Sequence, residues 1–262
     1  MTAPVPARLT WVGHATTVLD VGGVRVITDP LLKQRVAHLK RHGPPPPPID
    51  ADLVLLSHAH MDHLHVPSLR RLASGVPIVT PRGTADLLRR AGHTEIVEVD
   101  IGDHVEVAGA HLTVTPAMHK SGRGFHSRLT ADPIGFVIDV GGHRTYFAGD
   151  TDLFEGMRDL GDIDLALLPI WGWGPTIGVG HLDPERAVEA TSIIRPGLVV
   201  PVHWGTFAPE TLRRRPPGWL ATPAVRFEAA LAAHDDDLHA LVLPPGSSID
   251  LTDPPATDGV DP

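Results

Sequence analysis

The sequence has 262 residues and contains no cysteine, which excludes disulfides, thiolate metal ligands and cysteine nucleophiles. No stretch approaches the roughly 20 apolar residues that a membrane-crossing helix needs. The N-terminus also lacks a basic segment followed by an apolar signal core. Basic residues are in deficit, with 22 Lys and Arg against 31 Asp and Glu, so the net charge of −9 would repel a polyanion. We therefore expect a cytoplasmic protein with no stable membrane insertion and no nucleic-acid partner.

The composition is that of a folded globular chain that is unusually rich in histidine. Hydrophobic residues make up 42% and charged residues 20%, which is an ordinary balance for a protein with a substantial core. There are 17 histidines beside a single tyrosine. Because cysteine is missing, a metal ion would have to be held by His, Asp or Glu. The sequence gives no indication of the oligomeric state.

Short apolar runs predict strands along most of the chain, with a few helices between them. We expect strands near 9–12, 17–21, 24–28, 53–57, 77–80, 96–99, 104–107, 112–115, 135–140, 145–148, 165–168, 198–202 and 240–243, and helices near 67–71, 84–91, 183–195 and 224–233. Strands interleaved with helices predict an α/β fold with helices over the sheet faces. We interpret residues 1–250 as one domain and 251–262 as a flexible C-terminal tail.

One segment of the first third interrupts this pattern. It contains Lys33, Arg35, Lys40 and Arg41, followed by five prolines at 44–48. Proline in such density is incompatible with a helix or with the centre of a sheet. The segment is therefore predicted to be an extended surface loop, either a stiff spacer or a flap that faces the substrate.

The most informative motif follows the apolar run 53–56 and has the form H-x-H-x-D-H. Its members are His58, His60, Asp62 and His63. In an extended backbone, side chains two residues apart project to the same side, so His58, His60 and Asp62 would converge while His63 points elsewhere. One loop could thus serve two metal ions. A solvated polar loop is the alternative, and four ligand-type residues in six positions count against it.

Further candidate ligands lie elsewhere in the sequence, each just after an apolar stretch. They are His119, Asp150 and His203. In α/β folds, ligands gather at strand ends, where loops carry polar groups above a rigid sheet. Taken singly, each of these residues is equally typical of a hydrogen-bonded polar residue at the end of a strand.

Together these motifs resemble the metallo-β-lactamase-fold metal-dependent hydrolases. The resemblance covers His58–His63, His119, the Gly149-Asp150-Thr151 turn and the Val202-His203-Trp204-Gly205 turn, in the expected order. It implies an αββα sandwich with the site at one rim of the paired sheets.

Three further segments are most similar to one branch of that family. They are Trp11–Thr16, Thr28–Pro30 and His181–Glu185. The branch contains the phospholipase D that hydrolyses N-acylphosphatidylethanolamine and the ascorbate-6-phosphate lactonases.

The resemblance also implies which residues hold metal. The first ion would be held by His58, His60 and His119. The second would be held by Asp62, His63 and His203. Asp150 would bridge the two, because one carboxylate oxygen can face each cation. Zinc is the first candidate for both ions, and manganese, iron or nickel would tolerate much the same ligands.

Two ions of this kind can lower the pKa of a shared water toward about 7, so the expected nucleophile is a metal-bridging hydroxide. Asp62 would orient this hydroxide or manage its proton. The resemblance implies that His181 lies beside the substrate, where it would donate a hydrogen bond to a developing oxyanion or to the leaving group. The alternative for His181 is a helix-capping or buried structural role.

Other residues near these motifs have two interpretations each. His14 and Asp29 either support the ligands from behind or serve as turn residues. The indoles of Trp171 and Trp173 either form an apolar substrate wall or pack in the core. Three cationic residues either hold a phosphate or are solvated: Lys120, Arg123 and Arg128.

The leading interpretation is a dinuclear metal-dependent hydrolase acting on an ester bond. A phosphodiester, from a phospholipid-like or a phosphorylated small molecule, is the first candidate substrate, and a lactone or other cyclic ester is the alternative. Two other classes are a di-iron oxidoreductase and a metal-binding scaffold without turnover. The di-iron class usually carries a carboxylate at the second ligand position, where this chain has His60.

Overall fold

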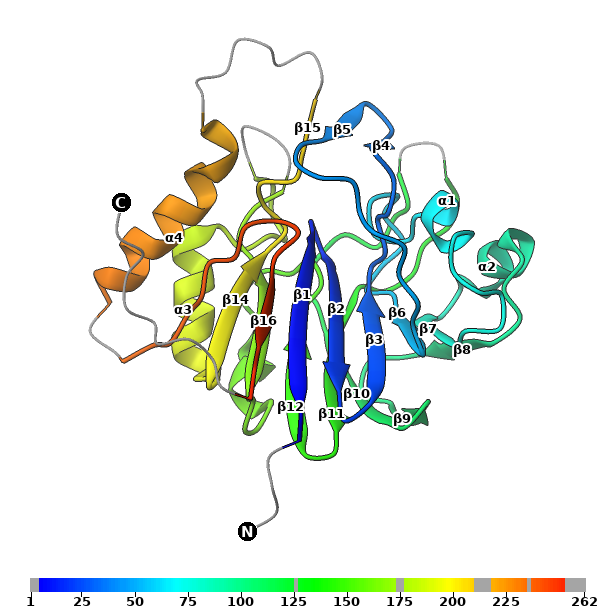
Figure 1. The fold of residues 1–262 in the computed structure, drawn as a ribbon, viewed down its shortest axis with the longest axis horizontal. Helices are drawn as coiled ribbons and strands as arrows, with labels where there is room; N and C mark the ends of the chain where they lie inside the picture. Colours follow the sequence, from blue (N-terminus) through cyan, green and yellow to red (C-terminus); the bar gives the residue numbers. More distant parts are fainter. Residues whose placement is uncertain (1–4, 125–126, 173–176, 210–217, 235–236, 253–262) are drawn as a thin grey trace.

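The chain folds into two stacked sheets with helices on the outside (Figure 1). The computed structural model describes residues 5–124, 127–172, 177–209, 218–234 and 237–252. Among these residues we find no helix with the length and apolar character needed to span a membrane.

The first sheet has seven strands in the order β16-β1-β2-β3-β6-β7-β8. Their bounds are β16 Ser248–Asp250, β1 Ala7–Gly13, β2 Thr16–Val21, β3 Val24–Thr28, β6 Leu53–Leu55, β7 Ile78–Pro81 and β8 Ile96–Val99. Strands β1, β2 and β3 form the predicted antiparallel meander, with the Gly22-Gly23 pair at its second turn. Both glycines have positive φ, which suits a tight hairpin. From β3 onward the strands run parallel.

The second sheet has six strands in the order β14-β13-β12-β11-β10-β9. Their bounds are β14 Leu198–Val202, β13 Leu165–Pro169, β12 His143–Phe147, β11 Ile134–Val140, β10 Ala110–Pro116 and β9 His104–Val107. Strands β9 to β12 are antiparallel, and β12, β13 and β14 are parallel. Strands of both sheets therefore end at a common rim, where the loops that follow them can meet.

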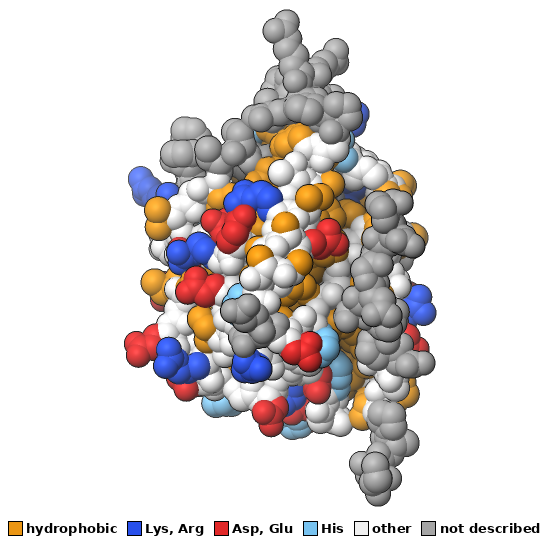
Figure 2. Space-filling model, turned by 90° about the vertical axis from the view of Figure 1, so that its left-hand side faces the viewer, with side chains coloured by type: hydrophobic (Ala, Val, Ile, Leu, Met, Phe, Trp, Pro, Cys, Tyr) orange, Lys and Arg blue, Asp and Glu red, His pale blue; other side chains and the backbone are white. Residues whose placement is uncertain are grey.

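Helices cover the outer faces of the two sheets. Their bounds are α1 Val66–Leu69, α2 Ala85–Ala91, α3 Pro184–Ile194 and α4 Thr222–Ala232, with short 3₁₀ turns η1 Glu155–Asp159 and η2 Trp219–Ala221. Asp183 caps α3 by accepting a hydrogen bond from the Arg186 amide at 2.8 Å. Figure 2 shows the face on the side of α3 and α4, where charged side chains of both signs are mixed with hydrophobic ones. One ion pair joins Arg226 of α4 to Glu185 of α3 at 2.5 Å.

Strand β6 shows why the run Leu53–Leu56 is continuously apolar. Leu53 and Leu55 belong to the core between the two sheets. Val54 and Leu56 point the other way and pack with Leu69 and Leu88 of the covering helices. All four are fully buried, because this strand is covered on both faces. The αββα sandwich that the resemblance implied is confirmed.

The prediction of a surface loop across residues 33–48 is wrong in its first half. Strands β4 (Arg35–Val36) and β5 (Leu39–Arg41) form a hairpin, which joins β15 (Phe207–Pro209) in a third sheet. Arg41 is buried, and its guanidinium donates to the carbonyls of Val12 at 3.0 Å and Leu31 at 2.6 Å. The sequence favoured a surface position for Arg41 because arginine is usually exposed, and the sequence does not reveal the two carbonyl groups that its guanidinium contacts. The proline run itself has no regular structure, as expected.

The C-terminal region also differs from the prediction. Residues 240–243 form only an isolated bridge from Ala240 to Val199, and the edge strand β16 was not predicted. The amide of Leu251 donates to the Ala7 carbonyl at 2.8 Å, and Thr252 Oγ1 accepts from the Ala7 amide at 3.3 Å. The hydrogen-bonded chain therefore reaches two residues into the predicted tail, and residues 253–262 lie outside the described part.

Candidate metal centre

The H-x-H-x-D-H loop leaves the end of β6 and turns sharply. The amides of His63 and Leu64 donate to the His60 carbonyl at 3.2 and 2.9 Å. The turn separates the side chains into two groups, with His58 and His60 in one and Asp62 and His63 in the other. The expectation that Asp62 shares a side with His58 and His60 is therefore wrong, because it assumed an extended backbone.

The first group is completed by His119, which follows β10. His60 Nδ1 lies 2.9 Å from His58 Nε2 and 3.1 Å from His119 Nε2. On its far side, His119 Nδ1 donates to the Gly180 carbonyl at 2.7 Å. A carbonyl only accepts, so Nδ1 carries the proton and the Nε2 lone pair of the neutral ring faces the other histidines.

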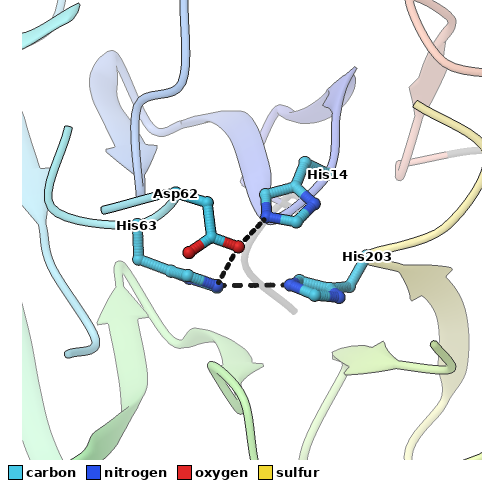
Figure 3. Close-up of side chains that lie close together, drawn as sticks. All are labelled: His14, Asp62, His63 and His203. Atoms are coloured by element: carbon cyan, nitrogen blue, oxygen red, sulfur yellow. Dashed lines mark hydrogen bonds and ion pairs between the residues drawn. The ribbon is translucent and has the colours of Figure 1, made fainter. Parts of the chain in front are cut away.

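The second group consists of His14, Asp62, His63 and His203 (Figure 3). His63 Nε2 lies 3.2 Å from His203 Nε2, and Asp62 Oδ2 lies 3.0 Å from His14 Nε2 and 3.8 Å from His63 Nε2. His203 Nδ1 donates to the Trp171 carbonyl at 2.6 Å, so in the neutral ring its Nε2 also presents a lone pair to the group.

His14 and His203 are held together by their backbones as well as by their rings. Their φ angles are 56° and 65°, in the left-handed region that non-glycine residues rarely adopt. The His203 amide donates to the His14 carbonyl at 2.9 Å, and the ring centroids are 3.9 Å apart. Two strained histidines in contact are typical of a functional site held by its surroundings.

Asp150, three residues after β12, lies between the two groups. Its Oδ1 is 3.2 Å from His203 Nε2, and its Oδ2 is 3.3 Å from His63 Nε2 and 3.9 Å from His119 Nε2. Gly149 permits this approach, since a Cβ there would lie 2.6 Å from the Ser57 Cβ. Asp150 is buried, and its Oδ1 makes no hydrogen bond despite its closeness to His203.

Asp29 and Ser57 connect the two groups from behind. Asp29 Oδ2 accepts from His63 Nδ1 at 2.6 Å and from Ser57 Oγ at 2.5 Å. Ser57 Oγ is in turn 2.9 Å from His58 Nδ1, and because its own proton is given to Asp29 it accepts from that ring. One buried carboxylate thus fixes the orientation of a histidine in each group. Asp29 therefore contacts the candidate ligands from behind, as one of its two interpretations predicted. His14 likewise contacts the candidate ligand Asp62.

The donor set fits divalent cations. Ring nitrogens of the first group, and those of His63 and His203, face each other at 2.9 to 3.2 Å. With the opposite nitrogens of His58, His119 and His203 donating, the Nε2 lone pairs of these three rings face the centre, where each is free to accept a proton from a neighbouring ring or to bind a cation. Asp150 Oδ1, which makes no hydrogen bond, is a further oxygen atom available to coordinate a cation. Imidazole and carboxylate donors suit zinc and also manganese, iron or nickel.

Burial keeps most of these imidazoles neutral, which metal ligation requires. It lowers the pKa of His58 and His203 well below their usual value, that of His60 to about 4, and that of His119. Their neutral Nε2 or Nδ1 atoms are therefore available at neutral pH.

His63 and the two carboxylates behave differently. Burial works against the protonation of His63, but the charges of Asp150, Asp29 and Asp62 outweigh it and raise the His63 pKa well above its usual value. Burial also works against the ionisation of Asp62 and Asp150, yet the surrounding histidines hold both pKa values well below the usual range. Without metal, a proton on His63 thus partly offsets the negative charge.

His181 lies at the edge of the first group. Its Nε2 is 3.7 Å from Asp150 Oδ2, and its ring centroid is 4.5 Å from that of His119. Its side chain is 23% exposed, and its Nδ1 donates to the Gly178 carbonyl at 3.1 Å. It does not cap α3, because Asp183 does, and it is not buried. The role of His181 beside the substrate stays a prediction.

The other candidates take varied places. Trp171 is buried in the core, with its ring 5.6 Å from that of Trp219. Of its two predicted roles, the structure shows core packing. Trp173 lies outside the described residues. Arg123 Nη1 donates to the carbonyls of Ala59 and Leu64 at 2.9 and 3.0 Å and so holds the ligand loop.

Lys120 and Arg128 are exposed, as solvated residues are. Sequence reasoning assigned no role to Ser57, although its position directly before His58 was a usable signal. The carbonyls of Gly180 and Trp171 carry no side-chain signal at all.

Comparison with known proteins agrees with this geometry. Residues 24–204 match the family described as the beta-lactamase superfamily domain. The fold and the donor groups thus define a metallo-β-lactamase-fold, metal-dependent hydrolase. Within that class, the chain belongs to the UPF0173 metal-dependent hydrolase family.

Three relatives illustrate the match. A UPF0173 metal-dependent hydrolase of Methanopyrus kandleri is 31% identical, over 92% of this chain and 98% of that protein. A protein of Mycobacterium tuberculosis is 34% identical, over 94% of this chain and 69% of its own length. The solved structure of Igni18, a metallo hydrolase from Ignicoccus hospitalis, is 25% identical with a TM-score of 0.64, and the match covers 94% of this chain and 98% of Igni18.

Proposed function

We propose that this chain hydrolyses a phosphodiester bond, in a phospholipid-like or a phosphorylated small molecule, with two divalent metal ions, zinc being the first candidate. One observation carries the proposal. Imidazole nitrogens from separate segments face one another in two groups, and the Asp150 carboxylate lies between the groups. We assign His58, His60 and His119 to one ion, Asp62, His63 and His203 to the other, and Asp150 to both.

When bound, two such ions would lower the pKa of a shared water toward about 7 and offset charge that develops on the substrate. The side chains of this protein supply the rest. Asp62 is ionised, is anchored through Oδ2 to His14, and remains 18% exposed. Its carboxylate would accept the proton of the attacking water.

His181 would act on the leaving group. Its Nδ1 donates to the Gly178 carbonyl, so its Nε2 can donate a proton only from the imidazolium form. In that form it would protonate the leaving oxygen of the ester. Asp62 and His181 thus divide the work of base and acid.

The choice of a phosphodiester rests on the similarity to the phospholipase branch at three segments: Trp11–Thr16, Thr28–Pro30 and His181–Glu185. Each of them lies at the centre. His14 contacts Asp62, Asp29 holds His63, and His181 borders His119. The all-imidazole first group argues against the di-iron alternative, which usually has a carboxylate in place of His60.

The proposal is tested by reconstituting the metal-free protein with zinc and assaying four substrate classes: bis(p-nitrophenyl) phosphate, p-nitrophenyl phosphate, simple lactones and a chromogenic β-lactam. We expect turnover of the diester that is lost on chelation and restored by zinc. Asp62→Asn should lose this activity. His104→Ala, which removes an exposed histidine of β9, is the matched control and should keep it.

Other outcomes would contradict the proposal in distinct ways. Hydrolysis of lactones alone would mean that the substrate assignment is wrong. Oxygen consumption by an iron-loaded protein would favour the oxidoreductase class. Two bound ions with no turnover of any substrate would favour a scaffold, and activity that survives complete removal of metal would refute the mechanism.

A further inference from the structure

Three exposed hydrophobic residues are chain neighbours of residues at the candidate metal centre. Among the described residues, five large hydrophobic side chains are exposed, and three of them adjoin residues of the centre. These three are Met61, Met118 and Val179, with exposed fractions of 47%, 53% and 87%. Single exposed apolar residues are ordinary, but a group of them at a site is informative. We call these three residues the apolar rim.

The backbone brings the members of the apolar rim together. Met61 lies between His60 and Asp62 in the chain, and Met118 directly precedes His119. Val179 is followed by Gly180, where a Cβ would lie 3.0 Å from the Met118 carbonyl oxygen and 3.2 Å from the His119 Cα. The segments of Val179 and Met118 are therefore packed against each other.

The first imidazole group links these two segments to Met61. His119 Nε2 lies 3.1 Å from His60 Nδ1, so Met118 and Met61 are each the chain neighbour of a histidine of this group. Asp152 and Arg186 form an ion pair beside the rim, and the Asp152 amide donates to the Met118 carbonyl at 3.1 Å. The charge of Asp152 is thus matched by that of Arg186.

The apolar rim contributes nothing to the described core clusters. The indole of Trp171, which the sequence offered as an apolar substrate wall, is buried instead. Among the described residues, Met61, Met118 and Val179 are the large exposed hydrophobic residues that neighbour the centre in the chain. Methionine is flexible and polarisable, which suits contact with apolar groups of varied shape.

We infer that the apolar rim binds an alkyl or acyl chain of the substrate, so that the substrate is an amphiphile with its ester bond next to an apolar chain. This inference rests on the proposed function and narrows its substrate class. The metal centre would hold the polar ester group, and the rim would shield the first carbons of the chain from water.

The test is a series of p-nitrophenyl alkyl phosphodiesters with chains from ethyl to octyl, used below their micelle concentrations. Complete burial of each added CH₂ is worth about a fourfold gain. A rim that covers one side of the chain should give roughly a twofold rise in kcat/KM per CH₂. The triple variant Met61→Gln, Met118→Gln, Val179→Thr should flatten this dependence. Val225→Thr, at a 60% exposed position on α4, is the matched control and should keep it.

Calorimetric titration of the zinc-loaded protein with n-alkylphosphonates of the same chain lengths provides a readout that needs no turnover. Affinity should rise with chain length in the wild type and in Val225→Thr, and remain flat in the triple variant. Circular dichroism would check that all variants are folded.

The outcomes separate this inference from the proposed function. Chain-length-dependent binding without turnover would support the rim and contradict the proposed hydrolysis. Turnover of the ethyl diester with no chain-length dependence in either assay would overturn the rim and leave the hydrolysis standing. Co-sedimentation with phosphatidylcholine vesicles that the triple variant loses, without chain-length dependence, would mean that the rim contacts a lipid surface, and the inference would also fail.

Discussion

The substitution Asp29→Asn tests the support behind both metal sites with almost no change in shape. Asp29 is fully buried, and it accepts three hydrogen bonds: from the Ser57 amide at 2.8 Å, from Ser57 Oγ at 2.5 Å and from His63 Nδ1 at 2.6 Å. A carboxylate can accept all three, whereas an asparagine side chain has one accepting oxygen and one donating NH₂ group.

Both orientations of the asparagine leave a conflict. If its oxygen faces the Ser57 amide, its NH₂ group meets His63 Nδ1–H, and His63 must move its proton to Nε2, where it blocks metal ligation. If its oxygen faces His63 instead, its NH₂ group meets the Ser57 amide and leaves a buried donor unpaired. An unpaired buried donor costs about 1–3 kcal/mol, which corresponds to about 5- to 150-fold in an equilibrium constant.

We therefore expect Asp29→Asn to weaken zinc binding by about 10- to 100-fold, the usual range for a residue that orients a ligand. The assay is competition with a chromophoric zinc chelator. Asp20→Asn, which alters a partly exposed ion pair with Arg25 in the same sheet, should bind zinc like the wild type. Zinc affinity of a folded Asp29→Asn protein within twofold of the wild type would refute the reasoning.

Three further predictions concern catalysis and protons. His181→Ala should lower kcat on a dialkyl phosphodiester, whose alkoxide must be protonated as it leaves, by about 100-fold or more with unchanged zinc content, as measured by steady-state kinetics and metal analysis; loss of zinc would mean that His181 is a ligand. In the metal-free protein, burial lowers the pKa of His60 and of His65 to about 4, so below pH 6.5 the unfolded chain binds protons that the folded chain does not. Stability should therefore fall between pH 6.5 and about 4, and urea unfolding that is flat across this interval would contradict it. The raised pKa of His63 means that zinc must displace its proton at neutral pH, so calorimetry in buffers of different ionisation enthalpy should detect about one proton released, and no release would contradict the assignment.

Much of the fold follows from periodicity. The meander β1-β2-β3 was predicted because alternating apolar residues and the Gly22-Gly23 turn are local signals. The doubly buried strand β6 was predicted from its continuous apolar run. The short strands β4, β5, β15 and β16 were missed, because two- or three-residue strands depend on distant pairing partners that leave no period in the sequence.

In the candidate site, too, the local features could be predicted from the sequence and the features that depend on distant partners could not. The residue types and strand-end positions of His119, Asp150 and His203 are visible in the sequence, and the structure brings them next to the loop that carries His58 and His63. The side of the loop on which Asp62 lies depends on a turn that no periodicity records. The partners of the ring nitrogens are carbonyls such as those of Gly180 and Trp171, which sequence reasoning cannot locate.

The central claim is that two separate groups of side chains each hold a metal ion, and metal stoichiometry tests it most directly. Zinc-reconstituted protein, analysed by mass spectrometry of its metal content after removal of free ion, should carry two zinc ions per chain. His119→Ala and His203→Ala should each retain one, because each variant damages a different group. Less than one zinc in the wild type, or two in both variants, would contradict the account.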